Sequence, residues 1–201
     1  MSDATDPTDH AFSASVKAAQ IRKGSRQHYA GMIMADRVDA RLAAFIGEVR
    51  SFYLGTASAD GQPYIQHRGG PKGFLRILDD KRLAFADLTG NRQYITTGNA
   101  AENRKAFIFL MDYANRRRIK LWGELEVIEG DADLTAALAV PGYRGKPEQA
   151  MVFTITAWDI NCPQHIPHLL PAEDVAEALS ARDARIAALE AQLAALSKSG
   201  T

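Results

Sequence analysis

The chain has 201 residues, of which 46% are hydrophobic and 24% charged, the composition of an ordinary globular protein. Its 24 Lys and Arg equal its 24 Asp and Glu, and no apolar run approaches the roughly 18 residues of a membrane helix. These totals argue against a strongly basic nucleic-acid binder and against a membrane protein, and the length suits one domain with an appended helix.

The first residues, "MSDATDPTDHAFSAS", are acidic and small and have no apolar core. This pattern is not a secretory signal, and residues 1–15 are predicted to be a disordered lead-in. Cys162 is the only cysteine in the chain. A single cysteine excludes an internal disulfide and a multi-cysteine metal site, and it favours a cytoplasmic location.

Positive charge is concentrated in the middle of the chain. Residues 66–120 contain twelve Lys or Arg and five Asp or Glu, an excess of seven positive charges that the rest of the chain offsets. Such a segment indicates a phosphorylated ligand or a solvated face, and nucleic acid is the least favoured partner because no aromatic RNA-binding signature accompanies it.

The first structural elements are predicted from periodicity. Asp36 precedes apolar residues at helical spacing through Val49, which predicts a capped helix. "SFYLGTAS" (residues 51–58) and "PYIQHR" (residues 63–68) flank Asp60-Gly61, a strong hairpin signal. "GFLRIL" (residues 73–78) and "LAFAD" (residues 83–87) continue this meander of strands.

The second half adds helices and longer strands. Asn91 is expected to cap a short helix that Gly98 ends. Strands follow at residues 105–113, 119–129 and 151–159, with a helical piece near residues 131–140. About seven strands with hairpin connections predict a mainly β fold with some α, an antiparallel barrel over residues 16–160 that closes without bare edges.

The last part, residues 172–201, has heptad character. Apolar residues recur there at alternating spacings of four and three, with one arginine among them: Val175, Leu179, Arg182, Ile186, Leu189, Leu193 and Leu196. This seam predicts a dimerisation helix, and the alternative is an amphipathic helix packed on its own barrel. Three heptads are marginal alone, so a second interface is expected.

Three basic elements indicate one anionic ligand. The stretch "QHRGGPK" combines Arg68 and Lys72 with glycines, and Arg92 lies at the start of the predicted helix, where free N–H groups favour an anion. A strand beginning near "RRRIK" places Arg118 and Lys120 on one face. The alternative is that most of these cations are solvated surface charges.

The order and spacing of these motifs resemble a known family. "FYLGTASADGQPYIQHRGGPKGFLRILDDKRLAFADLTGNRQYITTGNAAEN" is similar to the FMN-binding split barrel of the pyridoxamine 5′-phosphate oxidase superfamily, and the tail "AWDINCPQHIP" resembles one bacterial branch of it. The resemblance implies a six- to seven-stranded antiparallel split barrel and a homodimer with FMN at its interface.

The resemblance also implies where FMN is held. The family's strand under the flavin corresponds to Gln66, His67 and Arg68, with Gly69 beside the ring and Lys72 near the end of the run. Residues after the fourth strand fall on Ala86 and Asp87, and the family's phosphate cluster falls on Asn91, Arg92 and Gln93. Arg118 takes the place of a glutamine that opens the sixth strand and is expected to contact the flavin ring or phosphate.

Two departures from the family concern the substrate. The C-terminal Arg-Leu-His element that recognises pyridoxal is absent, and the second strand carries "QHRGGPK" in place of the Arg-plus-Lys pattern. We therefore expect no oxidation of pyridoxine phosphate. Residues 161–171 are expected to form a tail that covers the flavin of a partner subunit, with Trp158, Asn161 and Gln164 near the ring.

The function expected from the resemblance is an FMN-dependent oxidoreductase that acts on a small molecule with a reductant such as NAD(P)H. No catalytic residue is identifiable. A non-catalytic flavin-binding redox module and a split barrel that uses the deazaflavin F420 or haem are the alternatives, and a purely structural coiled-coil protein is a distant one. His67, His165 and His168 lack carboxylates at ligand spacing, so no metal is expected.

Overall fold

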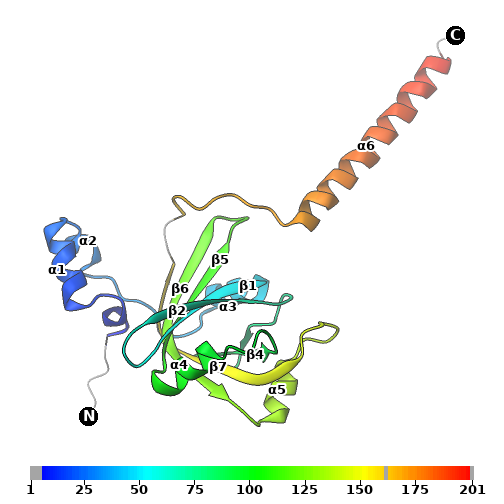
Figure 1. The fold of residues 1–201 in the computed structure, drawn as a ribbon. Helices are drawn as coiled ribbons and strands as arrows, with labels where there is room; N and C mark the ends of the chain where they lie inside the picture. The colour runs from blue at the N-terminus through cyan, green and yellow to red at the C-terminus, as the bar shows by residue number, and fades with distance from the viewer. Residues whose placement is uncertain (1–5, 161–162, 200–201) are drawn as a thin grey trace. The chain divides into compact units, whose positions relative to one another are not determined.

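A computed structural model describes residues 6–160 and 163–199 and divides the chain into two units. The first unit comprises residues 1–112 and 117–163, and it contains a seven-stranded, fully antiparallel sheet with the strand order β2-β1-β5-β6-β7-β4-β3 (Figure 1). The strands are β1 (Ser51–Ala57), β2 (Pro63–Gly69), β3 (Arg76–Ile77), β4 (Arg82–Leu88), β5 (Lys105–Asp112), β6 (Arg117–Ile128) and β7 (Pro147–Ile160). The predicted split-barrel fold is confirmed.

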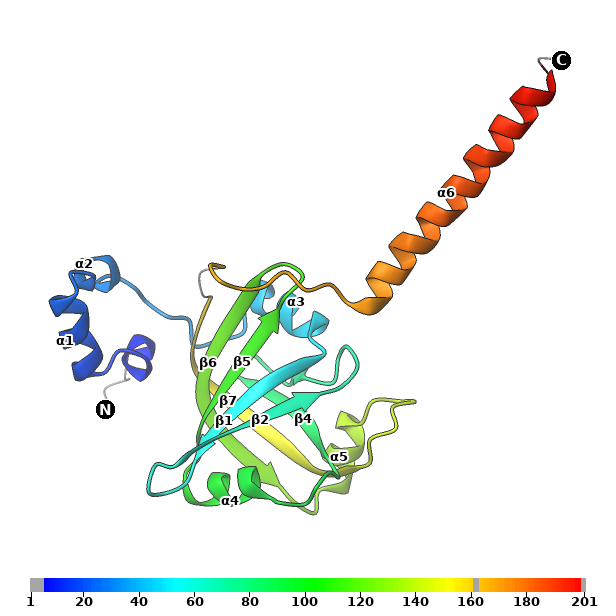
Figure 2. The ribbon, with the colours of Figure 1, turned by 45° about the horizontal axis from the view of Figure 1, so that its top comes forward.

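The helices of the first unit are short. They are η1, a 3-10 helix (Pro7–His10), α1 (Ala14–Arg22), α2 (Arg26–Tyr29), α3 (Ala40–Glu48), α4 (Ile95–Glu102) and α5 (Ala132–Leu138). Both α4 and α5 lie by the same end of the sheet (Figure 2). No helix among the described residues is both long enough and apolar enough to cross a bilayer.

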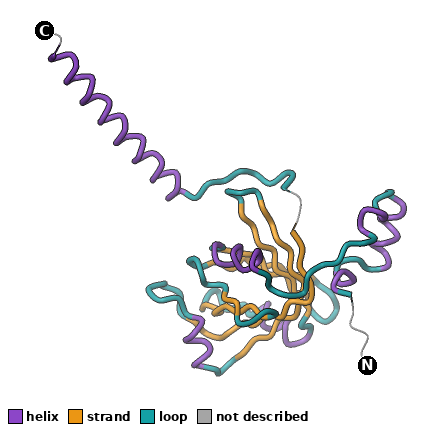
Figure 3. Tube along the Cα trace, turned by 180° about the vertical axis from the view of Figure 1, so that it is seen from behind, coloured by secondary structure: helices purple, strands orange, loops and turns teal. Residues whose placement is uncertain are grey.

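The core explains why these segments become strands. Alternate residues of β1 are buried, so Phe52 and Leu54 point into the core while Tyr53 points outward. The inward side chains of β4, β5, β6 and β7 join them in one cluster, and α3 contributes Leu42, Phe45 and Ile46 to it. Figure 3 shows the backbone of these strands from behind.

The sheet does not close into a hydrogen-bonded barrel, which corrects the prediction of a barrel without edges. β2 pairs only with β1, and β3 pairs only with β4. The glycines and proline after β2 explain the missing pairing, because Pro71 has no N–H and Gly73 adopts φ +82°. "GFLRIL" accordingly forms only the two-residue β3, and Phe74 and Leu75 enter the core from the preceding turn.

Two local predictions near the N-terminus are wrong. Residues 6–15 were expected to be disordered, but η1 forms there and buries Thr8, whose hydroxyl donates to Met32 O at 3.1 Å and accepts from Met34 N at 3.0 Å. The cap of α3 is Asp39 rather than Asp36, since the Asp39 carboxylate accepts from Leu42 N at 2.8 Å. Several acidic residues before a helix leave the cap ambiguous in sequence.

The second unit comprises residues 113–116 and 164–201 and consists mainly of α6 (Ala172–Ser199). α6 is one continuous helix of 28 residues, so the predicted helix is present from position 172 onward. Its apolar heptad residues are exposed, from 40% for Val175 to 68% for Leu196.

Candidate functional site

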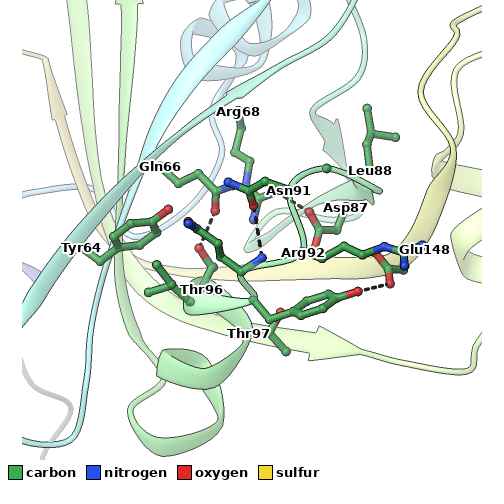
Figure 4. A pocket seen from close by; sticks show the side chains of 14 residues that line it. Tyr64, Gln66, Arg68, Asp87, Leu88, Asn91, Arg92, Thr96, Thr97 and Glu148 are labelled. Atoms are coloured by element: carbon green, nitrogen blue, oxygen red, sulfur yellow. Dashed lines mark hydrogen bonds and ion pairs between the residues drawn. The ribbon is translucent and has the colours of Figure 1, made fainter.

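A polar pocket of about 210 Å³ lies among β2, the loop after β4 and the first turn of α4 (Figure 4). Three separate segments of the chain line it: Tyr64, Gln66, Arg68, Asp87, Leu88, Gly90, Asn91, Arg92, Gln93, Tyr94, Ile95, Thr96, Thr97 and Glu148. Six of these were predicted as cofactor-binding residues from the sequence, namely Gln66, Arg68, Asp87, Asn91, Arg92 and Gln93.

Strand alternation decides which residues of β2 reach the pocket. Tyr64, Gln66 and Arg68 line it, and the residues between them point to the opposite face. His67 is therefore outside the pocket, where its ring makes an edge-to-face contact with Tyr53 at a centroid distance of 5.7 Å.

A buried ionic network forms one wall of the pocket. Arg68 pairs with Asp87, and the two side chains are only 12% and 11% exposed. The second carboxylate oxygen of Asp87 accepts from Gln149 Nε2 at 2.8 Å, and the same amide donates to Thr97 Oγ1 at 3.1 Å. Arg68 Nε is buried without a hydrogen-bond partner among the described residues. An acceptor on a bound ligand would satisfy this donor.

The loop between β4 and α4 has a strained backbone. Arg92 and Tyr94 adopt φ +58° and +53°, values that L-residues rarely take. Asn91 accepts from Gln93 N at 3.2 Å and shapes this turn, so it does not cap α4 as predicted. α4 begins only at Ile95, with no side-chain cap, and it continues through Gly98. Arg92 therefore lies three residues before the helix rather than in its first turn.

The first turn of α4 is held by side-chain hydrogen bonds to the sheet. Thr96 Oγ1 donates to Gln66 Oε1 at 2.8 Å, and Asn99 Nδ2 donates to Thr56 Oγ1 at 3.0 Å. Both residues are buried: Thr96 is 2% exposed and Asn99 is 9% exposed. These bonds fix the uncapped N-terminus of α4 at the pocket.

The carboxylate of Glu148 contacts Tyr94, at the end of the loop between β4 and α4. Tyr94 Oη donates to Glu148 Oε1 at 2.7 Å. This hydrogen bond raises the pKa of the Tyr94 phenol above its usual value, with further contributions from desolvation and from the charge of Glu148.

The charges that line the pocket balance: two arginines, Arg68 and Arg92, and two carboxylates, Asp87 and Glu148. Asp87 is neutralised by Arg68, whereas Arg92 forms no ion pair within the part of the chain that the structure describes. Figure 4 shows the Arg92 side chain extending toward Glu148. Arg92 is thus the cation that remains available to an anionic ligand.

An apolar depression of about 20 Å³ adjoins the polar pocket, and Leu88 lines both. Gly69 and Ala86, two predicted cofactor-binding residues, lie here with Gly70, Phe74 and Gly145 among others. A Cβ at Gly145 would lie 2.5 Å from Leu88 Cδ1, so a larger residue here would displace the Leu88 side chain.

The structure does not bring the other predicted residues to the pocket. Lys72 pairs with Glu48 at 2.5 Å in an exposed position. Trp158 is 3% exposed, and its indole N–H donates to Arg37 O at 2.7 Å, so it is a core residue outside the pocket lining. Arg118 lies on β6 opposite Met111, outside the pocket lining.

Two tail residues cannot be assigned to the pocket. Asn161 lies outside the described residues, and Gln164 belongs to the second unit. Within residues 6–160 and 163–199, no group of three His, Cys, Asp or Glu side chains could hold a metal ion.

Several pocket residues were missed in the sequence. Tyr64 lies on the same face of β2 as Gln66 and Arg68, so strand alternation could have identified it. Thr96 and Thr97 follow "GNRQY" after one intervening residue, Ile95, and hydroxyls at a helix start are a usable signal. Glu148 reaches the pocket, and Gln149 reaches Asp87 in its wall, only because β7 pairs with β4, which no local pattern indicates.

Comparisons with known proteins agree with this fold. Residues 38–162 match the family model described as pyridoxamine 5′-phosphate oxidase, a span that contains every residue lining the polar pocket. A search of curated proteins found no significant match.

Several solved structures of low sequence identity are similar to this chain. HupZ from Group A Streptococcus is 19% identical with a TM-score of 0.51, covering 66% of this chain and 99% of its own. An FMN-binding protein from Syntrophomonas wolfei is 14% identical with a TM-score of 0.48, covering 78% and 97%. The haem storage protein HutZ from Vibrio cholerae is 12% identical with a TM-score of 0.40, covering 62% and 94%.

The family model covers more than half of the chain and spans every strand of the sheet. This chain therefore belongs to the pyridoxamine 5′-phosphate oxidase family.

Proposed function

We propose that the polar pocket binds the phosphate end of FMN and that the protein is an FMN-dependent oxidoreductase acting on a small molecule. The observation that carries this proposal is the position of Arg92, an arginine without an ion pair among the described residues, beside the uncapped N-terminus of α4 in a member of this family. A phosphate carries about −1.5 to −2 charges and is favoured where guanidinium and free N–H groups converge.

The residues present fit a phosphate ester. Arg92 supplies charge, and the α4 N–H groups have no side-chain cap to occupy them. Thr97 adds a hydroxyl to the lining, and the buried Arg68 Nε lacks an acceptor among the described residues. Because Asp87 already binds Arg68 and Gln149, it presents less free negative charge to an anion than an unpaired carboxylate would.

The ring of the cofactor has an adjoining apolar surface. Leu88 connects the polar pocket to the depression formed by Gly69, Gly70 and Ala86. This depression holds only about 20 Å³, so within one chain it offers a surface for a planar ring rather than an enclosing slot. Flavin, when bound, supplies the electron and hydride chemistry, while the protein positions and shields it.

We propose that a second copy of the chain encloses the other side of the flavin ring, which one chain leaves open. The outward face of the sheet carries partly exposed aromatic side chains, among them Tyr53, Phe107, Phe109 and Trp122. An apolar sheet face of this kind is typical of an interface. We place a homodimer contact here, with the cofactor at its edge and Arg118 directed to it from the partner.

The proposed substrate is a small molecule other than pyridoxine phosphate, because the Arg-Leu-His element of that oxidase is absent from the sequence. NAD(P)H is the proposed reductant. No side chain of the pocket is assigned an acid–base role, since its carboxylates are engaged by Arg68, Gln149 and Tyr94.

The test compares two ligands on two proteins. FMN and riboflavin, which differ by the phosphate, are titrated into the wild type and into Arg92→Gln by calorimetry or flavin fluorescence. We expect Arg92→Gln to weaken FMN binding by about 10- to 100-fold, the range for one charge-assisted hydrogen bond, and to leave riboflavin binding unchanged. Equal loss for both ligands would contradict a phosphate contact.

Arg82→Gln is the matched control, because Arg82 is an exposed arginine on β4 that pairs with Asp79 at 2.7 Å away from the pocket. It should bind FMN like the wild type. The flavin-loaded protein is then mixed with NAD(P)H and an electron acceptor. Catalytic turnover supports the enzyme, and flavin binding without turnover supports a redox module. Purification with a haem Soret band or with F420 would overturn the FMN assignment.

A further inference from the structure

The C-terminal helix α6 (Ala172–Ser199) presents a continuous apolar seam. Val175, Leu179, Ile186 and Leu189 are 40%, 50%, 48% and 40% exposed, values typical of surface polar residues rather than of leucine or isoleucine. At 1.5 Å per residue the 28-residue helix is about 42 Å long. An exposed apolar stripe of this length requires a partner.

The spacing of the seam defines heptad positions. Leu179, Ile186 and Leu193 take position a, and the residues three places after or four places before them take position d: Val175, Arg182, Leu189 and Leu196. The register runs without interruption, and no glycine or proline breaks it between Ala172 and Ser199. A strict 3.5-residue repeat is the pattern of a helix that pairs with another helix.

The charges beside the seam identify the partner. Between Ala178 and Leu196 the charged residues are Arg182 at d, Asp183 and Glu190 at e, and Arg185 at g, whereas alanine and one serine occupy the outer positions. Arg185 and Glu190 have no oppositely charged residue three or four places away in α6, so neither forms the usual pair within one helix. Their positions suit contacts between helices.

The sign of these charges selects the orientation. In a parallel coiled coil, g of one helix meets e of the other, which pairs Arg185 with Glu190 of a second copy, twice per dimer. In an antiparallel arrangement, e meets e and g meets g. Because both charged residues at position e are acids and the one charged residue at position g is a cation, no antiparallel register forms an e–e or g–g pair of opposite charge.

Arg182 adds to this preference. As the one polar member of the seam, it lies beside position e of the facing helix in the parallel form, where Asp183 of the second copy can pair with it. A polar residue at one core position is known to fix register at a cost in stability. We infer that α6 forms a parallel, in-register, two-stranded coiled coil with α6 of a second copy of this chain. This contact uses a surface separate from the pocket and does not depend on the bound cofactor.

The test uses engineered cysteines in the full-length chain with Cys162→Ser. Leu189→Cys at position d should form an intermolecular disulfide, because the parallel register places the two copies of residue 189 opposite each other in the seam, where a small adjustment gives disulfide geometry. Ala188→Cys, on the outer face, is the matched control and should not cross-link under the same oxidation. Disulfide formation is read on non-reducing gels, and sedimentation gives the number of chains.

The alternatives give different results. An antiparallel pair would cross-link Leu179→Cys with Leu189→Cys in a mixture and neither alone. A helix packed on its own barrel would give no intermolecular disulfide at any concentration, and sedimentation of a trimer would exclude the two-stranded form. Each result overturns the proposal. Arg185→Glu should slow Leu189→Cys cross-linking, and Arg185→Glu with Glu190→Arg should restore it; no change in either would contradict the charge pairing.

Discussion

Arg68 of β2 forms an ion pair with Asp87 of β4, two strands that share no backbone hydrogen bonds. β2 is one edge of the sheet, and β4 lies beside β3 at the other. The pair therefore joins the two ends of an open sheet by side chains where the backbone does not close it. It also places the Arg68 guanidinium at the wall of the polar pocket.

Asp87→Ala should lower the free energy of unfolding by about 2–4 kcal/mol, because it leaves an almost buried Arg68 without its counter-charge and removes an acceptor from Gln149. Denaturant unfolding measures the change. A double-mutant cycle with Arg68→Met should show that the two substitutions are strongly non-additive.

The comparison for this substitution is Glu48→Gln, which breaks an ion pair with Lys72 whose side chains are 51% and 70% exposed. We expect a change below about 1 kcal/mol, since solvent screens exposed pairs. Equal effects for Asp87→Ala and Glu48→Gln would show that burial of the Arg68 pair contributes nothing.

Gly123→Ala should destabilise the sheet by about 2–3 kcal/mol, as overpacked cores do. A Cβ at this position would lie 2.2 Å from Thr154 O and 2.6 Å from Phe153 Cζ, where the β6–β7 register shifts. Thermal unfolding measures the effect.

Gly98→Ala supplies the opposite control. Gly98 lies within α4, and a Cβ there would meet nothing within 4 Å. Alanine should stabilise the protein by about 0.5–1 kcal/mol because it has the higher helix propensity. Similar effects at both positions would refute the steric argument for Gly123.

Thr56→Val should lower stability by about 1–3 kcal/mol, because it preserves shape but leaves the buried Asn99 amide without its acceptor. The lost bond is one that holds α4 against β1, so weaker FMN binding should accompany the loss of stability. Unfolding and FMN titration of the same variant measure the two effects. Unchanged stability would mean that Asn99 finds another acceptor.

The Tyr94 phenol should ionise above its usual pKa of 10.0, because its O–H donates to Glu148. The pKa is raised by folding, so the contribution of this bond to stability is present below pH 10 and is lost as the pH rises through the higher folded-state pKa. The difference in ultraviolet absorbance between the wild type and Tyr94→Phe during alkaline titration gives the midpoint. Glu148→Gln should lower that midpoint, and a midpoint unaffected by this change would contradict the assignment.

Local pattern was sufficient for much of the fold. Alternation in "SFYLGTAS" and the Asp60-Gly61 turn predicted the β1–β2 hairpin, and the heptads predicted α6, because these signals depend on neighbours in sequence. The cap of α3 and the start of α4 were misplaced. Competing side-chain hydrogen bonds, such as that of Asn91 to Gln93 N, decide such boundaries.

The pocket was predicted only in part. Gln66, Arg68 and Arg92 were identified because their residue types and spacing carry the family's pattern. Lys72 was assigned to it by the same pattern and Trp158 through the irregular tail that follows it, yet the fold gives Lys72 an exposed pairing with Glu48 and buries Trp158 against Arg37. Side-chain direction at these positions depends on contacts that no short segment encodes.

The sequence by itself determined a mainly β chain with a basic middle and a heptad helix, since composition, turns and periodicity are local properties, and its motifs carry the resemblance to the pyridoxamine 5′-phosphate oxidase family. Only the tertiary structure decided that the sheet stays open, that Arg68 forms an ion pair with Asp87, and that Arg92 has no ion pair among the described residues. Those outcomes depend on pairing between residues far apart in the chain, such as Asp87 with Gln149 across β4 and β7, and such pairings form only when the strands assemble.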